Sequence, residues 1–342
     1  MVNQELVAYH NLVPVLAFSI DPAVFWPYAA GAAILVVGFP VVMMGAARRA
    51  RGLDKLAAFG PTLFGIAMAV FGADHFVGAS FVASIVPSWI PWHLFWTYFV
   101  GTALIAGGLS FATGIQWRLA AASFVAMLLI FELTIHLPNL YSVPHDRLRL
   151  TLVLREFSLM AGCLAFAASQ VRQTATAGAR SGALFSALVS KRLVAVACFL
   201  LAIPVGKFGI EHFLNRNFAP GIPQDNPRLK IPMPSWLPAH TLWIYLTGSI
   251  FVVCAIALIT RRYARAASGL IGATILVITA LVYLPVTIAR ASDVANGLNY
   301  LAIHFALAGS ALMLAGALPS RSPALAAVPE PEPAGLERVA NS

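Results

Sequence analysis

Nine long apolar segments restrict this chain to one kind of fold. A helix needs about 20 apolar residues to cross the hydrocarbon core of a bilayer, and only helices or closed barrels satisfy their backbone hydrogen bonds there. Of the 342 residues, 60% are hydrophobic and 10% are charged, which is typical of an all-α polytopic membrane protein and of no soluble class. The expected transmembrane helices are 22–46, 56–83, 91–113, 117–138, 147–173, 190–216, 239–262, 264–288 and 294–318.

The basic residues lie in short clusters beside these segments, so the net charge of +9 does not indicate a nucleic-acid partner. Fourteen basic residues fall on one side of the expected topology and six on the other. Because cytoplasmic loops are enriched in Lys and Arg, we expect an outside N-terminus and a cytoplasmic C-terminus in a bacterial-type inner membrane. The N-terminal stretch has Glu5 and a short apolar run, so we expect no cleavable signal peptide.

The sequence contains an internal repeat that covers most of the expected membrane domain. Segments 87–101 and 234–248 are identical at eight of fifteen positions with a constant offset of 147, and upstream the offset is 137. The difference is a proline-rich insert before Pro234, which we expect to be an extracytoplasmic loop. The sequence therefore predicts one N-terminal helix and two parallel four-helix repeats. The expected parts are an N-terminal segment (1–55), the first repeat (56–173), a cytoplasmic linker (174–189), the second repeat (190–318) and a disordered tail (319–342).

An acidic residue on a first helix, then Pro-Ser-Trp-x-Pro, Phe/Leu-Trp-x-Tyr-x-x-Gly and an Arg-x-Ala-Ala turn at Arg118 follow one another in order. In this arrangement the chain resembles the DoxX-like family of small four-helix membrane proteins, in tandem duplication and with an extra helix. The resemblance covers both repeats and implies four-helix bundles with a polar pocket. Some members of the family are linked to thiosulfate:quinone oxidoreduction, and others to redox-associated or metal-associated maturation pathways.

Titratable residues inside the spans suggest where chemistry takes place, because such residues are costly at membrane depth. Glu132 and His136 stand four residues apart, so both share one helix face and suit proton donation and acceptance. Asp74 and His75 are adjacent and point about 100° apart, so we expect one to face the bundle and the other a neighbouring helix. Their role is either proton handling or an interhelical hydrogen bond.

The second repeat has Thr279 and Tyr283 at the positions that match Glu132 and His136. The first repeat is therefore expected to carry the principal polar site. Arg155-Glu156 could form an internal ion pair or provide a partner for Glu132. His304 could supply a polar group to a second pocket.

A further set of polar and aromatic residues is expected to bind a ligand or to serve the architecture. Lys207 and Glu211 can form an ion pair, the histidines that follow the Trp-x-Pro turns can mark helix starts, and the aromatic residues can anchor the interface or wall a flat quinone or isoprenoid head group. The set is Trp89, His93, Trp96, Tyr98, Lys207, Glu211, His212, Trp236, His240, Trp243 and Tyr245.

A metal site is disfavoured because no pair has a dedicated spacing such as His-x-x-x-His, although His75, His93, His136, Asp74 and Glu132 could converge. Rossmann, P-loop and Cys-x-x-Cys motifs do not occur. Three hypotheses follow. The chain could be a quinone-linked redox component with a redox partner protein, a cofactor-free acid–base isomerase or cyclase acting on an isoprenoid-type lipid, or a non-catalytic scaffold or assembly subunit. Transport is a weaker fourth.

Overall fold

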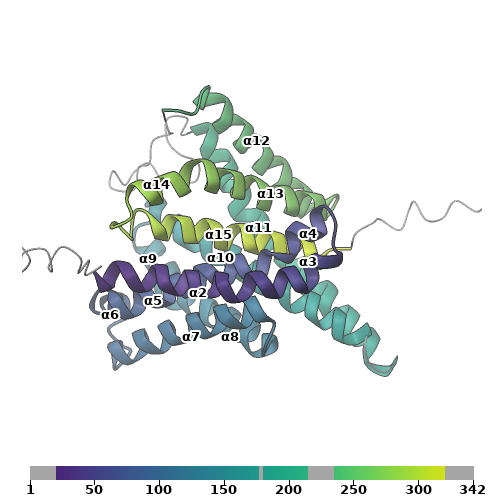
Figure 1. Ribbon diagram of the computed structural model, residues 1–342, viewed down its shortest axis with the longest axis horizontal. Coiled ribbons are helices and arrows are strands. Elements are labelled where there is room, and N and C mark those ends of the chain that lie inside the picture. The colour runs from purple at the N-terminus through teal and green to yellow at the C-terminus, as the bar shows by residue number, and fades with distance from the viewer. Residues whose placement is uncertain (1–20, 177–179, 215–234, 320–342) are drawn as a thin grey trace, which may run out of the picture.

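The protein is an all-α integral membrane protein (Figure 1). The computed structural model describes residues 21–176, 180–214 and 235–319, and these ranges contain no strand. Nine helical segments of the described chain are long and apolar enough to cross a membrane. Their helices are α2 (Pro22–Met44) with α3 (Ala46–Arg49), α4 (Leu53–Ala58) with α5 (Gly60–Val77), α7 (His93–Thr113), α8 (Trp117–Phe131) with α9 (Leu137–Ser142), α10 (Arg147–Thr176), α11 (Arg180–Leu214), α12 (His240–Ile259), α13 (Ala264–Ile278) with α14 (Leu284–Ala289), and α15 (Leu298–Ala317).

These helices agree with the nine expected spans to within a few residues, with two differences. The second span ends at Val77 and is followed by the separate short helix α6 (Ala79–Ile85). Most of the expected linker 174–189 is helical, because α10 continues to Thr176 and α11 begins at Arg180. Ala, Leu and Arg are strong helix formers, and they outweigh the Gly and Ser residues of this stretch. The proline-rich insert and the expected disordered tail lie outside the described residues, apart from Pro319.

The backbone repeats with the sequence. Residues in the left-handed region precede or join equivalent helices in both halves, each pair separated by the offset of 147 expected from the side chains. The pairs are Trp92 (φ 58°) with Ala239 (φ 54°), Gly114 (φ 75°) with Arg261 (φ 59°), and Gln116 (φ 53°) with Tyr263 (φ 57°). The same helix starts and the same turn are therefore built twice.

A π-turn interrupts the third helix of each repeat. The turns η2 (Glu132–His136) and η4 (Thr279–Tyr283) are 147 residues apart, and each is followed by Leu-Pro. The proline ring would clash with the carbonyl group four residues back in a regular α-helix, and the wider turn accommodates it. Such turns are frequent at functional sites, and here one contains both Glu132 and His136.

Glycines allow the first two helices of each repeat to pack closely. A Cβ atom on Gly72 would lie 2.8 Å from the carbonyl oxygen of Gly101, and one on Gly209 would lie 3.0 Å from that of Gly248. Small residues of this kind let transmembrane backbones approach each other. The α5–α7 and α11–α12 pairs are therefore equivalent in packing as well as in sequence.

The two repeats share one core. The last helix of the first repeat, α10, packs along α11, and the last helix of the second repeat, α15, packs along α5. Helices α10 and α15 also contact each other in the middle of the molecule (Figure 1), and a single hydrophobic cluster includes residues of both repeats. The extra helix α2 packs against α5 and α7.

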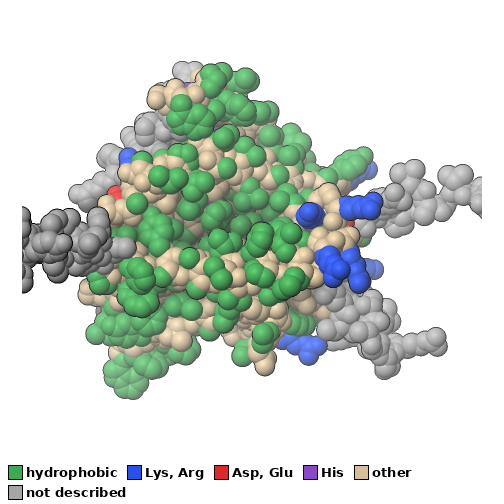
Figure 2. Space-filling view, viewed as in Figure 1, with side chains coloured by type: hydrophobic (Ala, Val, Ile, Leu, Met, Phe, Trp, Pro, Cys, Tyr) green, Lys and Arg blue, Asp and Glu red, His purple; other side chains and the backbone are tan. Residues whose placement is uncertain are grey.

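The surface has an apolar flank and one end rich in basic residues. Figure 2 shows hydrophobic side chains over the flank and Lys and Arg side chains gathered at the end where α3 and α4 lie in Figure 1. Arg48, Arg49, Arg51 and Lys55 are exposed there. We call this the basic end. Helices α6, α9 and α14 lie at the opposite end (Figure 1).

Candidate functional site

A cavity of about 480 Å³ lies in the first repeat, toward the end opposite the basic end. Helices α5, α6, α8 and α10 and the start of α15 contribute most of its wall, and we call it the first cavity. Much of the lining is apolar, including Met68 and Leu128. Its polar lining residues are Asp74, His75, Arg155, Glu156 and Asn299.

Asp74 and His75 both line the first cavity, but their side chains have different neighbours. The Nδ1 atom of His75 lies 2.7 Å from the carbonyl oxygen of Phe71, one turn back, which holds the ring against its own helix. The Asp74 side chain instead accepts a hydrogen bond from Asn299 of α15. The first repeat's acidic residue is thus tied to the second repeat.

Glu132 is almost completely buried, with 1% of its surface exposed, and neither of its carboxyl oxygens has a hydrogen-bond partner. It lies behind the cavity wall and interacts electrostatically with Glu156, which lines the cavity. The Nε2 atom of His136 lies 3.8 Å from Oε1 of Glu156, and the Oε2 atom of Glu156 is buried without a partner. Glu156 therefore connects the Glu132–His136 pair to the first cavity.

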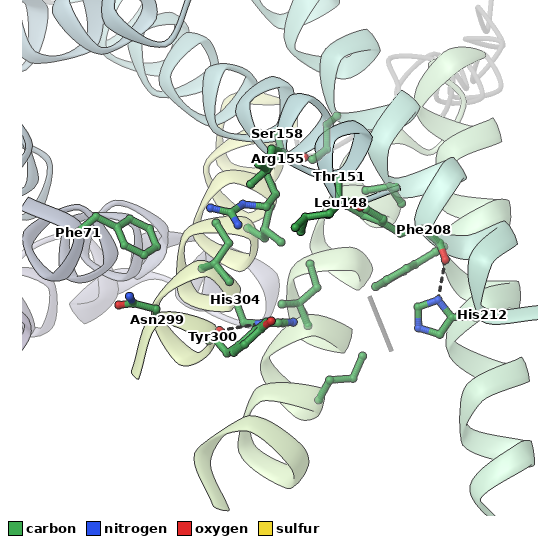
Figure 3. A pocket seen from close by; sticks show the side chains of 18 of the residues that line it. Phe71, Leu148, Thr151, Arg155, Ser158, Phe208, His212, Asn299, Tyr300 and His304 are labelled. Carbon is green, nitrogen blue, oxygen red and sulfur yellow. Dashed lines mark hydrogen bonds between the residues drawn. The ribbon is translucent and has the colours of Figure 1, made fainter. Parts of the chain in front are cut away.

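A second cavity, of about 420 Å³, lies between α10 of the first repeat and α11, α13 and α15 of the second, with Phe251 of α12 in its wall (Figure 3). Its polar lining includes His212, Tyr300 and His304. The first and second cavities meet at four residues that line both: Phe71, Arg155, Ala295 and Asn299. Arg155 and Asn299 therefore stand between the two cavities.

The two cavities occupy equivalent places in the repeats. Met68, His75 and Leu104 line the first, and their counterparts Val205, His212 and Phe251 line the second. The backbone contact of His75 also recurs, because the Nδ1 atom of His212 lies 2.6 Å from the carbonyl oxygen of Phe208. A carbonyl oxygen only accepts, so each Nδ1 carries the proton, and Nε2 of the neutral ring is left as an acceptor.

His304 lines the second cavity, as expected from the alignment of the two repeats. Its Nδ1 atom lies 2.6 Å from the carbonyl oxygen of Tyr300, and its ring stacks on Tyr283 with the centroids 3.7 Å apart. Tyr283 replaces His136 of the first repeat and is fully buried. The described lining of the second cavity thus has imidazole and phenol groups and no carboxyl group, whereas Asp74 and Glu156 line the first.

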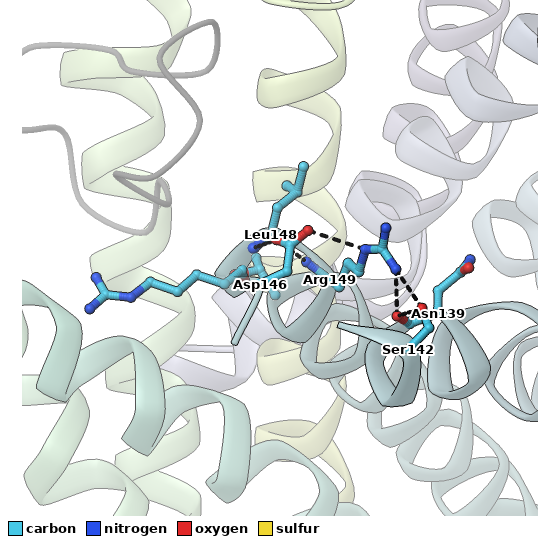
Figure 4. A network of polar contacts seen from close by, with 7 residues as sticks. Asn139, Ser142, Asp146, Leu148 and Arg149 are labelled. Carbon is cyan, nitrogen blue, oxygen red and sulfur yellow. Dashed lines mark hydrogen bonds and ion pairs between the residues drawn. The ribbon is translucent and has the colours of Figure 1, made fainter. Parts of the chain in front are cut away.

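A polar network at the end opposite the basic end fixes the start of α10 (Figure 4). Asp146 accepts hydrogen bonds from the backbone N–H groups of Leu148 (2.9 Å) and Arg149 (3.3 Å) and caps the helix. Arg149 donates to the carboxylate of Asp146 (3.1 Å), the carbonyl oxygen of Asn139 (2.6 Å) and the hydroxyl of Ser142 (2.8 Å). These bonds tie α9 to α10 and so fix the depth of Arg155 and Glu156.

Several predicted site residues lie away from both cavities. Lys207 and Glu211 form an ion pair on another face of α11 from His212. The aromatic residues are largely at the surface, with Phe76–Tyr98 and Phe213–Tyr245 ring stacks repeated in the two halves. His93 and His240 begin α7 and α12. The predicted residues that line neither cavity are Trp89, His93, Trp96, Tyr98, Glu132, His136, Lys207, Glu211, Trp236, His240, Trp243 and Tyr245.

In the described part of the chain, no group of three His, Cys, Asp or Glu side chains is arranged to hold a metal ion. The five residues that could have converged do not, since His93 lies at the start of α7, away from the cavities.

Asn299 is the site residue that sequence reasoning missed. Its contact with Asp74 joins positions 225 apart, and a polar residue at a helix start gives no signal of such a partner. The charged Arg155-Glu156 pair inside a span was noticed, but its position between two cavities was not predictable.

Comparison with known proteins does not assign the chain to a family or a function. The chain matches no family model, no curated protein and no solved structure. The DoxX-like resemblance therefore stays a prediction that rests on the sequence motifs.

Proposed function

We propose that the protein binds the polar head of a membrane-soluble quinone in the first cavity and exchanges protons with it. The observation that carries the proposal is the set of unsatisfied polar atoms beside that cavity: both carboxyl oxygens of Glu132, Oε2 of Glu156, Nε of Arg155 and Oδ1 of Asn299. Buried polar groups are normally hydrogen-bonded. A bound head group, with water, provides the missing partners.

The chemistry of the wall suits a quinone. A quinone presents carbonyl oxygens that accept hydrogen bonds and take up protons on reduction, and carboxyl and imidazole groups are common proton donors and acceptors. Glu132 and Glu156 hold exchangeable protons, and Arg155 is a donor. In this proposal a redox partner protein exchanges the electrons, and the DoxX-like resemblance agrees with such a role.

The first cavity also offers a path to the bilayer. It extends to Ala23 of α2 and to Phe81 of α6, whose surface is 70% exposed. A ligand with its head at Glu156 can therefore leave an isoprenoid tail at the apolar flank. We further propose a bacterial-type inner membrane, with the basic end in the cytoplasm.

The second candidate is an acid–base isomerase or cyclase acting on an isoprenoid-type lipid. Two neighbouring carboxyl groups, Glu132 and Glu156, favour it, because one can donate a proton while the other accepts one. A scaffold or assembly subunit is the remaining alternative.

The test is quantification by mass spectrometry of quinone copurified in mild detergent with wild type, Glu132→Gln and Thr279→Val. Thr279 is the buried counterpart of Glu132 in the second repeat, so its variant is a matched control. Glu132 lies behind the cavity wall, so in this proposal it reaches the head group through Glu156 and water. Leaving a buried polar group of this chain without its partner costs about 1–3 kcal/mol, or about 5- to 100-fold in affinity. We expect that loss in Glu132→Gln and near-stoichiometric quinone in the other two.

Equal quinone content in all three proteins would overturn the assignment of this cavity. An isoprenoid without a quinone ring, lost in Glu132→Gln, would select the isomerase. Only bulk lipid in every sample would select the scaffold.

A further inference from the structure

The second cavity differs from the first in its charge. Thr279 and Ile303 stand where the first repeat has Glu132 and Glu156, and Glu211, the counterpart of Asp74, pairs with Lys207 instead of lining the cavity. No carboxyl group lines the second cavity among the described residues. Its one charged lining residue is Arg155.

Arg155 interacts electrostatically with Glu156 and Tyr300, but it forms no salt bridge with another described residue. The described residues form four salt bridges, none of which involves Arg155, and its Nε atom is buried without a hydrogen-bond partner. Glu156, its neighbour in sequence, faces only the first cavity. A buried donor without a hydrogen-bond acceptor is costly, and a guanidinium group binds carboxylate and phosphate oxygens in a bidentate fashion.

Other polar groups lie around the same space. Figure 3 shows Arg155, Tyr300 and His304 toward the middle of the cavity and His212 at its α11 side. His212 has 2% of its surface exposed, and its Nε2 atom has no partner. The wall between these groups is apolar and includes Leu201, Val205 and Ile275.

We propose that the second cavity binds an anionic amphiphile, with its carboxylate or phosphate head on Arg155 and its hydrocarbon chain along α11 and α13. Tyr300 is a further donor to the head group. The volume of about 420 Å³ falls in the range of about 300–1,000 Å³ found for small-molecule sites. This site shares Arg155 with the proposed quinone site, and it differs from that site in lying between α10, α11, α13 and α15.

The test uses full-length protein in phosphatidylcholine nanodiscs and radiolabelled dodecanoate as the probe. We expect saturable binding that dodecyl phosphate or unlabelled dodecanoate displaces and dodecanol does not. The stronger of the two displacers identifies whether lipid phosphates or free carboxylates are preferred. Arg155→Gln should weaken binding at least about tenfold, as expected for a lost charged partner.

A matched pair of cavity-filling variants locates the site and covers the case in which Arg155→Gln does not fold. Val205→Trp fills the second cavity, and Met68→Trp fills the equivalent place in the first. Binding should be lost in Val205→Trp and kept in Met68→Trp, with thermal unfolding confirming that both fold. Displacement by dodecanol as strong as by the anions, unchanged binding in Arg155→Gln, or equal loss in the two Trp variants would each overturn the proposal.

Discussion

Equivalent residues in the two repeats have acquired different surroundings. Asp74 lines a cavity and bonds Asn299, whereas Glu211 at the matching position pairs with Lys207. The first repeat has Val70 in place of Lys207 and so offers Asp74 no such cation. The pairing of Lys207 and Glu211 was predictable from their spacing of four residues on one helix. The partner of Asp74 was not, because it comes from the other repeat.

We expect Lys207→Met to destabilise the protein, because it leaves the carboxyl group of Glu211, which is 9% exposed, without its cation. Loss of one partner of a buried polar pair costs about 1–3 kcal/mol, and more for charged groups. The double variant Lys207→Met with Glu211→Leu should recover most of that stability, since an apolar pair often replaces a buried ion pair without loss.

Thermal unfolding in detergent, followed by circular dichroism, checks this expectation. A double variant no more stable than Lys207→Met would show that the pair is not a structural ion pair. If both variants lost ligand binding while their stability was unchanged, Lys207 and Glu211 would be ligand-binding residues instead.

At the scale of elements, hydrophobicity and length predicted every described span, because a bilayer imposes both. Neither hydrophobicity nor length predicts where a helix departs from regular α-helical geometry. The Leu-Pro dipeptides of the third helices were visible as part of the repeat, but the π-turns before them were not predicted. Helical structure in the linker 174–189 was not predicted either, although Ala, Leu and Arg, which are strong helix formers, occur throughout it.

We expect Pro138→Ala to reduce quinone binding and Pro285→Ala to leave it unchanged. Alanine restores the backbone N–H and removes the ring clash that the π-turn relieves, so a regular α-helix becomes possible. That change would rotate Glu132 and His136 relative to Glu156. The second repeat has Thr279 and Tyr283 in its turn, away from the proposed quinone site, which makes Pro285→Ala a matched control.

The quinone content of the two purified proline variants, measured by mass spectrometry as for Glu132→Gln, tests this expectation. Equal quinone content in the two proline variants would mean that the π-turn does not position the site.

At the scale of the molecule, the sequence repeats predicted two four-helix units but not how these units pack against each other. Similarity between two segments says nothing about how they dock. In the structure α10 packs along α11 and α15 along α5, so the repeats interlock and both cavities reach Arg155 and Asn299 at the centre. An intramembrane site shared by two repeats follows from that docking alone.

The whole molecule also has a polarity that labelling can test. Arg51 lies exposed at the basic end, and Ser292 lies exposed between α14 and α15 at the opposite end. The native Cys163, Cys198 and Cys254 are buried and free, so a membrane-impermeant maleimide should not label wild type. Because Lys and Arg favour the cytoplasmic side, Ser292→Cys should be labelled in intact cells, and Arg51→Cys only after permeabilisation. The reverse pattern would invert the proposed orientation and place the first cavity toward the cytoplasm.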